Sequence, residues 1–102
     1  GVYRSGTEDD NEQLWLRGKG MEYALVTVRK KKMHWQADME LPARMKIREL
    51  AVQILETLKL HDEERFYHVS EISLFYQDKK LHMDASLADY MIWDGSILDI
   101  RY

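Results

Sequence analysis

Residues 74–98 read LFYQDKKLHMDASLADYMIWDGSIL, and this stretch decides the fold. Starting just before it, every second residue from Ile72 to Tyr76 belongs to one apolar face, which is the period of a β-strand. The polar run Gln77–Lys80 predicts a turn after that strand. We expect Leu81 to belong to a short return strand, so the first half of the stretch predicts a hairpin.

The second half of the stretch predicts a helical turn followed by a final strand. Residues 86–90 fit a single helical turn capped by Ser86, because a serine oxygen accepts a hydrogen bond from the free backbone N–H groups at a helix start. The pair Asp94-Gly95 then turns the chain. The last strand has one apolar face made of Leu98, Ile100 and Tyr102.

Two further strands are predicted upstream. Residues 22–29 are rich in β-forming side chains, and apolar residues alternate strictly from Met33 to Leu41. The run Arg29–Lys32 forms a polar connection, which predicts a hairpin without a readable turn type. Pro42 ends the second strand because proline has no amide for the ladder.

The segment after Pro42 has the spacing of an amphipathic helix. Its apolar positions fall at i, i+3, i+4, i+7, i+8 and i+11, namely Ile47, Leu50, Ala51, Ile54, Leu55 and Leu58. The acidic stretch His61–Glu64 ends this helix. The predicted class is therefore α+β, with the order ββαββ and one long helix packed across a mixed sheet.

This order resembles the β-grasp fold of ubiquitin, most specifically in the C-terminal third. Residues 74–81, 86–92 and 95–98 are similar, without a gap, to the ubiquitin succession of strand, turn, Thr-Leu-Ser-Asp-Tyr-x-Ile segment and final strand. By this resemblance Leu87 plugs the open end of the core, Tyr90 anchors the turn with its ring and hydroxyl, and Ile92 returns the chain to the core.

Within that superfamily, residues 87–98 are similar to the ending of the YukD/EsaB-like proteins of bacterial type VII (WXG100) secretion loci. The resemblance implies a small cytoplasmic, non-enzymatic adaptor or regulator that binds a protein component of the secretion machinery. It covers residues 21–102, which we expect to be the ubiquitin-like domain. The glycine-rich residues 1–20 are expected to be a flexible leader or a cloning remnant.

The chain ends at Arg101-Tyr102, where a conjugated ubiquitin or a sulfur carrier has a flexible Gly-Gly tail. We therefore do not expect conjugation. Two alternatives stay open: a modifier or sulfur carrier with a truncated tail, and the cytosolic ubiquitin-like domain of a larger membrane secretion protein. The natural sequence beyond Tyr102 distinguishes them.

The resemblance also indicates a binding surface. The apolar patch of ubiquitin maps onto Phe75, Asp99 and Arg101, so only one of three positions stays apolar and ubiquitin receptors are not expected to bind here. We expect Phe75 to be the central protein-binding anchor, with Lys79, Asp99 and Arg101 around it. Trp93 is a second aromatic anchor candidate, because tryptophan is enriched in binding hot spots.

Composition argues against several other functions. The 102 residues carry 15 Lys or Arg and 18 Asp or Glu, a net charge of −3, which does not favour nucleic acid. No apolar run is long enough to insert into a membrane, there is no cysteine, and the four histidines lack metal-ligand spacing. We therefore expect no enzyme activity, cofactor, metal or nucleic-acid partner.

One local conflict remains in the predicted helix. Arg44 and Lys46 lie near its start, where the helix dipole disfavours positive charge, and no Ser, Thr, Asp or Asn offers a cap. Together with Arg48 they are candidates for holding an acidic partner segment, although ordinary surface placement is the more common explanation.

Overall fold

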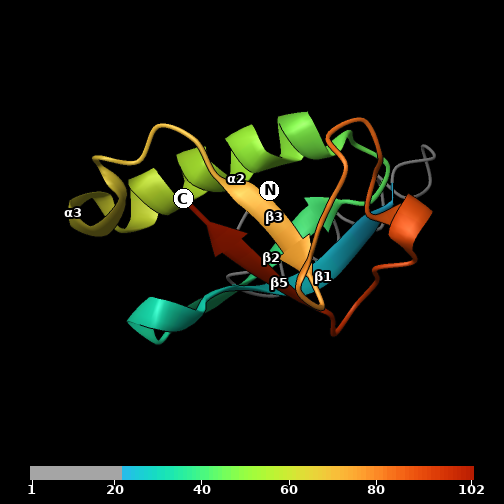
Figure 1. The fold of residues 1–102 in the computed structure, drawn as a ribbon, viewed down its shortest axis with the longest axis horizontal. Coiled ribbons are helices and arrows are strands. Elements are labelled where there is room, and N and C mark those ends of the chain that lie inside the picture. Colours follow the sequence, from blue (N-terminus) through green and yellow to red (C-terminus); the bar gives the residue numbers. More distant parts are fainter. Residues whose placement is uncertain (1–21) are drawn as a thin grey trace, which may run out of the picture.

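The computed structural model describes residues 22–102, so the expected leader over residues 1–20 lies outside the described residues. The chain forms a mixed five-stranded sheet with one long helix across it, as expected from the sequence (Figure 1). The elements are, in chain order, β1 Tyr23–Lys30, η1 Lys31–Met33, β2 Trp35–Pro42, α2 Ile47–His61, α3 Glu63–Phe66, β3 Ser73–Tyr76, β4 Lys79–Lys80, η2 Ala88–Tyr90 and β5 Ile97–Arg101.

The strands are ordered β2-β1-β5-β3-β4 in the sheet. The first and last strands lie side by side and run parallel, with Val28 opposite Leu98, while the other neighbours are antiparallel. In β3 and β5, Leu74 lies opposite Ile100 and Phe75 opposite Asp99. Because side chains alternate between the two faces of a strand, these two pairs belong to opposite faces of the sheet.

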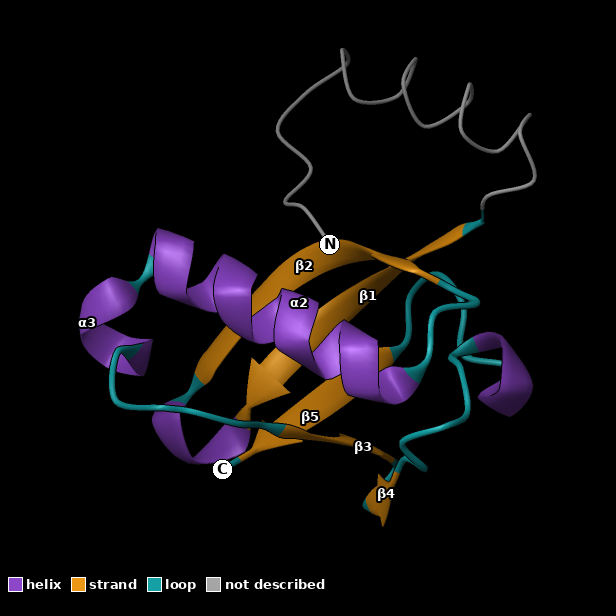
Figure 2. Ribbon diagram, turned by 90° about the horizontal axis from the view of Figure 1, so that it is seen from above, coloured by secondary structure: helices purple, strands orange, loops and turns teal. Residues whose placement is uncertain are grey.

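Helix α2 lies across one face of the sheet and covers the core (Figure 2). The apolar residues that predicted the helix are all buried, and they meet the inward residues of the strands. The fully buried side chains include Met39, Leu41, Leu74 and Leu98. We call the sheet face opposite to α2 the outer face.

The uncapped start of α2 is explained by a distant loop. Lys46 precedes the helix and makes no side-chain cap. Instead, the backbone N–H of Ile47 donates to the carbonyl of Ala85 (2.8 Å) and the N–H of Arg48 to that of Met83 (3.0 Å). The loop thus satisfies donors that a capping side chain normally satisfies.

The positive charges at this end of α2 also have partners. Arg48 Nη2 lies 2.7 Å from Asp84 Oδ1, and Arg44 Nε lies 3.2 Å from Glu22 Oε2. Hydrogen bonding to Arg48 lowers the pKa of the Asp84 carboxyl. Two of the three cations considered for an acidic partner are therefore occupied within the domain.

Two sequence predictions about the elements need correction. The acidic stretch does end α2 at His61, but the predicted order ββαββ has no second helix at this point, and Glu63–Phe66 form one, the short helix α3. Its start is capped by Asp62, whose carboxylate accepts from the backbone N–H of Arg65 at 3.4 Å. The buried Phe66 gives α3 its packing, and it contacts the Trp35 ring edge-on at 5.3 Å.

The second correction concerns the hairpin after β3. The turn is confined to Gln77 and Asp78, which both have positive φ (51° and 65°), and the return strand β4 is Lys79–Lys80 rather than the Leu81 region. Two left-handed residues are the geometry of the tightest hairpins, where glycine or asparagine is usual. Neither residue is glycine, so the pattern could not be read from the sequence.

The region that resembled ubiquitin is built as expected. Leu87 and Ile92 are fully buried. The backbone N–H of Asp89 donates to Ser86 Oγ at 3.3 Å, and the N–H of Ser86 donates to Asp89 Oδ2 at 2.9 Å, so Ser86 caps the turn. The Tyr90 hydroxyl oxygen accepts from the backbone N–H of His82 at 2.8 Å, which anchors the turn to the loop before it.

Candidate functional site

Three of the predicted binding residues meet on the outer face. Phe75 lies opposite Asp99, and Arg101 lies opposite Ser73 two residues along the same strand pair. Residues i and i+2 of a strand share a face, so Phe75, Asp99 and Arg101 are immediate neighbours. The register of β3 against β5 thus assembles the site from two separate segments.

Phe75 is covered by a cation rather than bare. The guanidinium carbon of Arg101 lies 3.8 Å from the centroid of the Phe75 ring, and the ring is only partly exposed. An arginine stacked on an aromatic ring is held by the negative face of the ring and by dispersion. Phe75 and Arg101 therefore present one joint surface.

Asp99 is the buried centre of the outer face, with 5% of its surface exposed. Arg29, its neighbour on β1, holds it with two hydrogen bonds: Nε to Oδ1 at 2.7 Å and Nη2 to Oδ2 at 3.1 Å. Hydrogen bonding to Arg29 lowers the pKa of the Asp99 carboxyl, and the same bond raises the pKa of Arg29. The pair therefore holds two charged side chains at fixed positions within the site.

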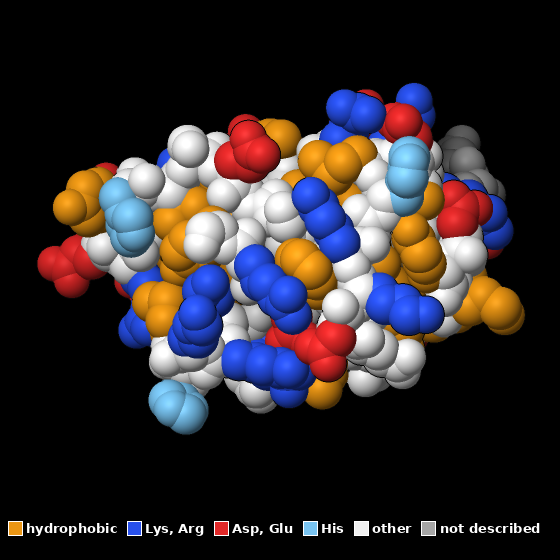
Figure 3. Space-filling model, viewed as in Figure 1, with side chains coloured by type: hydrophobic (Ala, Val, Ile, Leu, Met, Phe, Trp, Pro, Cys, Tyr) orange, Lys and Arg blue, Asp and Glu red, His pale blue; other side chains and the backbone are white. Residues whose placement is uncertain are grey.

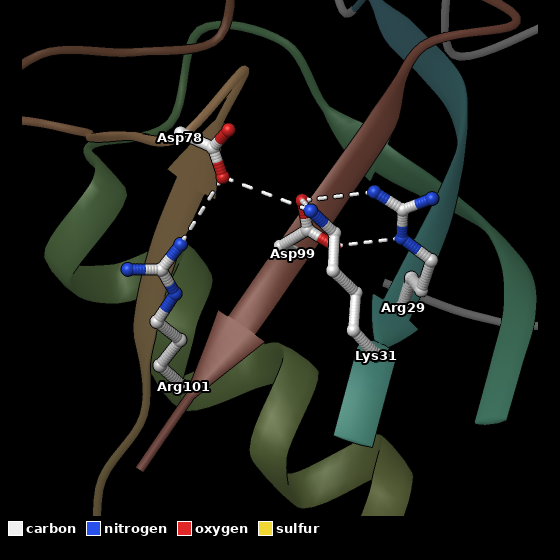
Figure 4. Close-up of polar contacts among 5 residues, drawn as sticks. All are labelled: Arg29, Lys31, Asp78, Asp99 and Arg101. Atoms are coloured by element: carbon white, nitrogen blue, oxygen red, sulfur yellow. Dashed lines mark hydrogen bonds and ion pairs between the residues drawn. The ribbon is translucent and has the colours of Figure 1, made fainter. Parts of the chain in front are cut away.

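A second carboxylate, Asp78 of the β3–β4 turn, lies above this pair. Its Oδ1 is 3.4 Å from Arg101 Nη2 and 3.7 Å from Lys31 Nζ, and Lys31 Nζ also lies 4.0 Å from Asp99 Oδ2. The Asp78 side chain is 75% exposed. Figure 4 shows Arg29, Lys31, Asp78, Asp99 and Arg101 together on the side of β3 and β5 away from α2.

The cations extend beyond these ion pairs. A hollow of about 400 Å³ is lined by Lys30, Lys31 and Lys32 together with Asp99 and the end of β5. In Figure 3, lysine and arginine side chains gather over β3 and β5 around a few acidic ones. We call this region the basic surface; it comprises Arg29, Lys30, Lys31, Lys32, Lys80 and Arg101.

The sequence predicts a polar hairpin connection over Arg29–Lys32. In the structure, β1 continues to Lys30, and residues 31–33 form a 3₁₀ turn that ends at His34 in a left-handed conformation (φ 51°). Burial lowers the pKa of Lys30, and the nearby charges of Lys32 and Arg101 lower it further. The connection is thus part of a crowded positive surface.

The two remaining predicted residues lie elsewhere in relation to Phe75. Lys79 lies opposite Tyr76, so its register is that of the sheet face that α2 covers. The residue opposite Phe75 is Lys80, not Lys79. Trp93, 39% exposed, lines a hollow of about 360 Å³ with Glu22, Tyr23 and Asp94 near the start of β1. The structure therefore does not bring Trp93 into the Phe75 site.

Sequence reasoning missed Arg29, Lys31 and Asp78 as members of the site. Arg29 had a usable signal, because it lies on the outward register of β1, alternating with the buried Val26 and Val28. Asp78 had no such signal. Its position depends on the two-residue turn and on the packing of β3 beside β5.

The described residues show no arrangement typical of a metal centre or a membrane span. In the range 22–102, no group of three or more His, Asp or Glu side chains is placed to hold a metal ion. Over the same range, no helix combines the length and the apolar character needed to cross a bilayer.

Comparison with known proteins supports the family assignment and the fold. Residues 23–100 match the YukD family model, described as protein YukD of the WXG100 protein secretion system. A comparison with curated proteins found no match. Several solved structures with the ubiquitin-like β-grasp fold are similar to this chain. Because their sequence identities are under 25%, the similarity shows the fold alone.

Two of these structures are isolated ubiquitin-like domains. The EccD5 domain from Mycobacterium xenopi is 19% identical with a TM-score of 0.64, and the match covers 78% of this chain and 93% of that chain. The domain of the Mycobacterium tuberculosis type VII secretion protein ECCD1 is 21% identical with a TM-score of 0.66, covering 80% and 100%.

A third similar structure belongs to a larger assembly. A chain of an ESX-5 inner membrane complex is 21% identical with a TM-score of 0.64. The match covers 78% of this chain but only 20% of that chain. In that complex the ubiquitin-like fold is therefore a small part of a longer polypeptide.

Proposed function

The chain belongs to the YukD family of the WXG100 protein secretion system, and from this premise we propose that it is a non-enzymatic ubiquitin-like adaptor of type VII secretion. The adaptor binds a protein component of the secretion machinery through the outer face of its sheet. It acts on the cytoplasmic side, as the resemblance to small cytosolic proteins of these loci implies.

The observation that carries the proposal is the joint surface of Phe75 and Arg101. A partly exposed aromatic ring, capped by an arginine and surrounded by ion pairs, has the residue types that dominate binding hot spots. The Arg29–Asp99 pair beneath it holds the backbone and side chains in place, so little ordering entropy is lost on binding.

The first experiment substitutes Phe75→Ala and captures partners from cells that contain the secretion system. Because Phe75 lies on the outer face, the domain stays folded, and we expect capture of a secretion component to fall by at least about tenfold. Val52→Ala is the matched control, since Val52 is a 56% exposed apolar residue on α2. A folded Phe75→Ala variant that captures the same component equally well would show that the outer face is the wrong surface.

A second candidate function is favoured by the ESX-5 match, in which a similar domain is one fifth of a longer chain. The same surface would then serve a cytosolic domain of a larger membrane secretion protein. The intact mass of the native polypeptide, purified from source cells, separates the two. A mass near that of residues 21–102 supports the free adaptor, and a much larger mass that includes an apolar segment supports the second candidate.

A further inference from the structure

The basic surface contrasts with the charge of the rest of the domain. Residues 22–102 contain 12 Lys or Arg and 14 Asp or Glu, so the described domain is net negative. Six of those 12 cations form the basic surface. Asp78 and Asp99 lie among them, and Asp94 lines a neighbouring hollow with Arg29 and Lys31. The domain is therefore strongly polarised, and this surface is complementary to a negative ligand.

The two carboxylates within the surface differ in accessibility. Asp99 is buried and doubly bonded to Arg29, so its place is fixed. Asp78 is 75% exposed and its contacts with Arg101 (3.4 Å) and Lys31 (3.7 Å) are long. Exposed ion pairs of this kind contribute little to stability, so an incoming carboxylate can replace Asp78 without unfolding anything.

We propose that the basic surface binds an acidic segment of the partner protein, whose carboxylates take the place of Asp78 on Arg101 and Lys31. This inference rests on the proposed adaptor function and names the chemistry of the partner at the same surface. Asp78 thus competes with the carboxylates of the partner for Arg101 and Lys31. Lys30 and Lys32, which have no ion pair with another described residue, supply further contacts along the hollow.

The geometry favours a peptide over single-stranded nucleic acid. The hollow of about 400 Å³ accommodates a few side chains of an extended segment. Single-stranded nucleic acid needs free aromatic faces for stacking, but Arg101 covers Phe75 and Lys30 Nζ lies 4.0 Å from the Tyr102 ring centroid.

The test measures fluorescence anisotropy of a labelled peptide of alternating glutamate and aspartate with the full chain at low ionic strength. A matched peptide of alternating glutamine and asparagine is the neutral control. We expect the acidic peptide to bind, with an affinity that falls as salt is added, and the neutral peptide not to bind.

Four variants test the competition. Arg101→Gln is expected to weaken binding of the acidic peptide about two- to fivefold, and Asp78→Asn to strengthen it by a similar factor. Lys59→Gln and Glu56→Gln, both on α2, change the net charge by the same amounts and are expected to have smaller effects. Asparagine tolerates the left-handed backbone of position 78, so the Asp78→Asn variant keeps the turn.

Several outcomes would overturn the inference. These are no binding of the acidic peptide, weaker binding by Asp78→Asn, or effects no larger than those of the α2 controls. Tighter binding to single-stranded RNA, or to vesicles of phosphatidylcholine and phosphatidylglycerol in equal parts, would assign the surface to another ligand class. Failure of the proposed function is distinguishable, because it shows as partner capture that does not depend on Phe75, whatever the peptide does.

Discussion

At the scale of single residues, Arg101 connects the two features of the outer face. Its guanidinium carbon stacks 3.8 Å from the centre of the Phe75 ring, and its Nη2 lies 3.4 Å from Asp78. One side chain therefore contributes to both the aromatic and the ionic part of the surface. A lysine at this position keeps the charge but loses the planar stacking.

Asp99 is the residue whose ionisation matters most for stability. Its folded-state pKa is lowered, chiefly by the hydrogen bonds from Arg29, so folding favours the carboxylate form. This stabilisation is fully present above the ordinary carboxyl pKa of about 3.9 and is lost as the pH falls through the lower folded-state value. We expect Asp99→Asn to lower the free energy of unfolding by about 1 kcal/mol at neutral pH, and the difference from wild type to shrink below about pH 4.

Urea unfolding monitored from neutral pH down to about pH 2 checks this expectation. Glu56→Gln controls for the change of one unit of net charge. If the difference between wild type and Asp99→Asn stayed constant throughout this range, the Arg29–Asp99 bond would not be the source of the stability.

At the scale of elements, the short helix α3 closes one end of the core. Four residues are too few to form a stable helix alone, so the burial of Phe66 must hold α3 in place. The Phe66 ring contacts Trp35 at 5.3 Å and Tyr102 at 6.3 Å, both edge-on. It thereby joins β2 to the C-terminal end of β5.

We expect Phe66→Ala to lower the free energy of unfolding by about 3–5 kcal/mol, because it removes a fully buried ring and leaves a cavity. Tyr67→Ala is the neighbouring control: Tyr67 is 70% exposed, and its loss is expected to cost at most about 0.5 kcal/mol. Chemical denaturation of both variants checks this prediction. Similar midpoints for the two would mean that α3 does not contribute to the core.

At the scale of the whole molecule, the position of charge matters more than its sum. The chain carries a net charge of −3, yet the basic surface gathers cations from β1, η1, β4 and β5. Local fields of this kind reach about 10 Å at an ionic strength of 0.1 M. The binding of a polyanion therefore depends on the local charge of the basic surface rather than on the net charge of the chain.

Cation-exchange chromatography at low salt tests this distribution. We expect the double variant Lys31→Gln/Lys32→Gln to elute at lower salt than Lys46→Gln/Lys59→Gln, although both have the same net charge. The reason is that Lys31 and Lys32 lie in the basic surface, while Lys46 and Lys59 lie just before and within α2. Equal elution of the two variants would contradict the polarised distribution.

The sequence alone determined the architecture of this protein. Helix α2 and the alternation in β2 were readable because hydrophobic periodicity is a local property of the chain. The burial of Leu87 and Ile92 followed from the resemblance to ubiquitin. The placement of Phe75, Asp99 and Arg101 on one face followed from the family resemblance, and the strand register confirms it. Their role in binding remains a prediction.

Only the tertiary structure decided which distant groups meet. Asp78 reaches Lys31 because the left-handed turn and the strand order bring together segments far apart in sequence. For the same reason, the carbonyls of Met83 and Ala85 accept hydrogen bonds from the first N–H groups of α2, and the Phe66 ring contacts the Trp35 ring. Such contacts depend on register, twist and turn geometry in three dimensions, which no periodicity along one strand or helix encodes.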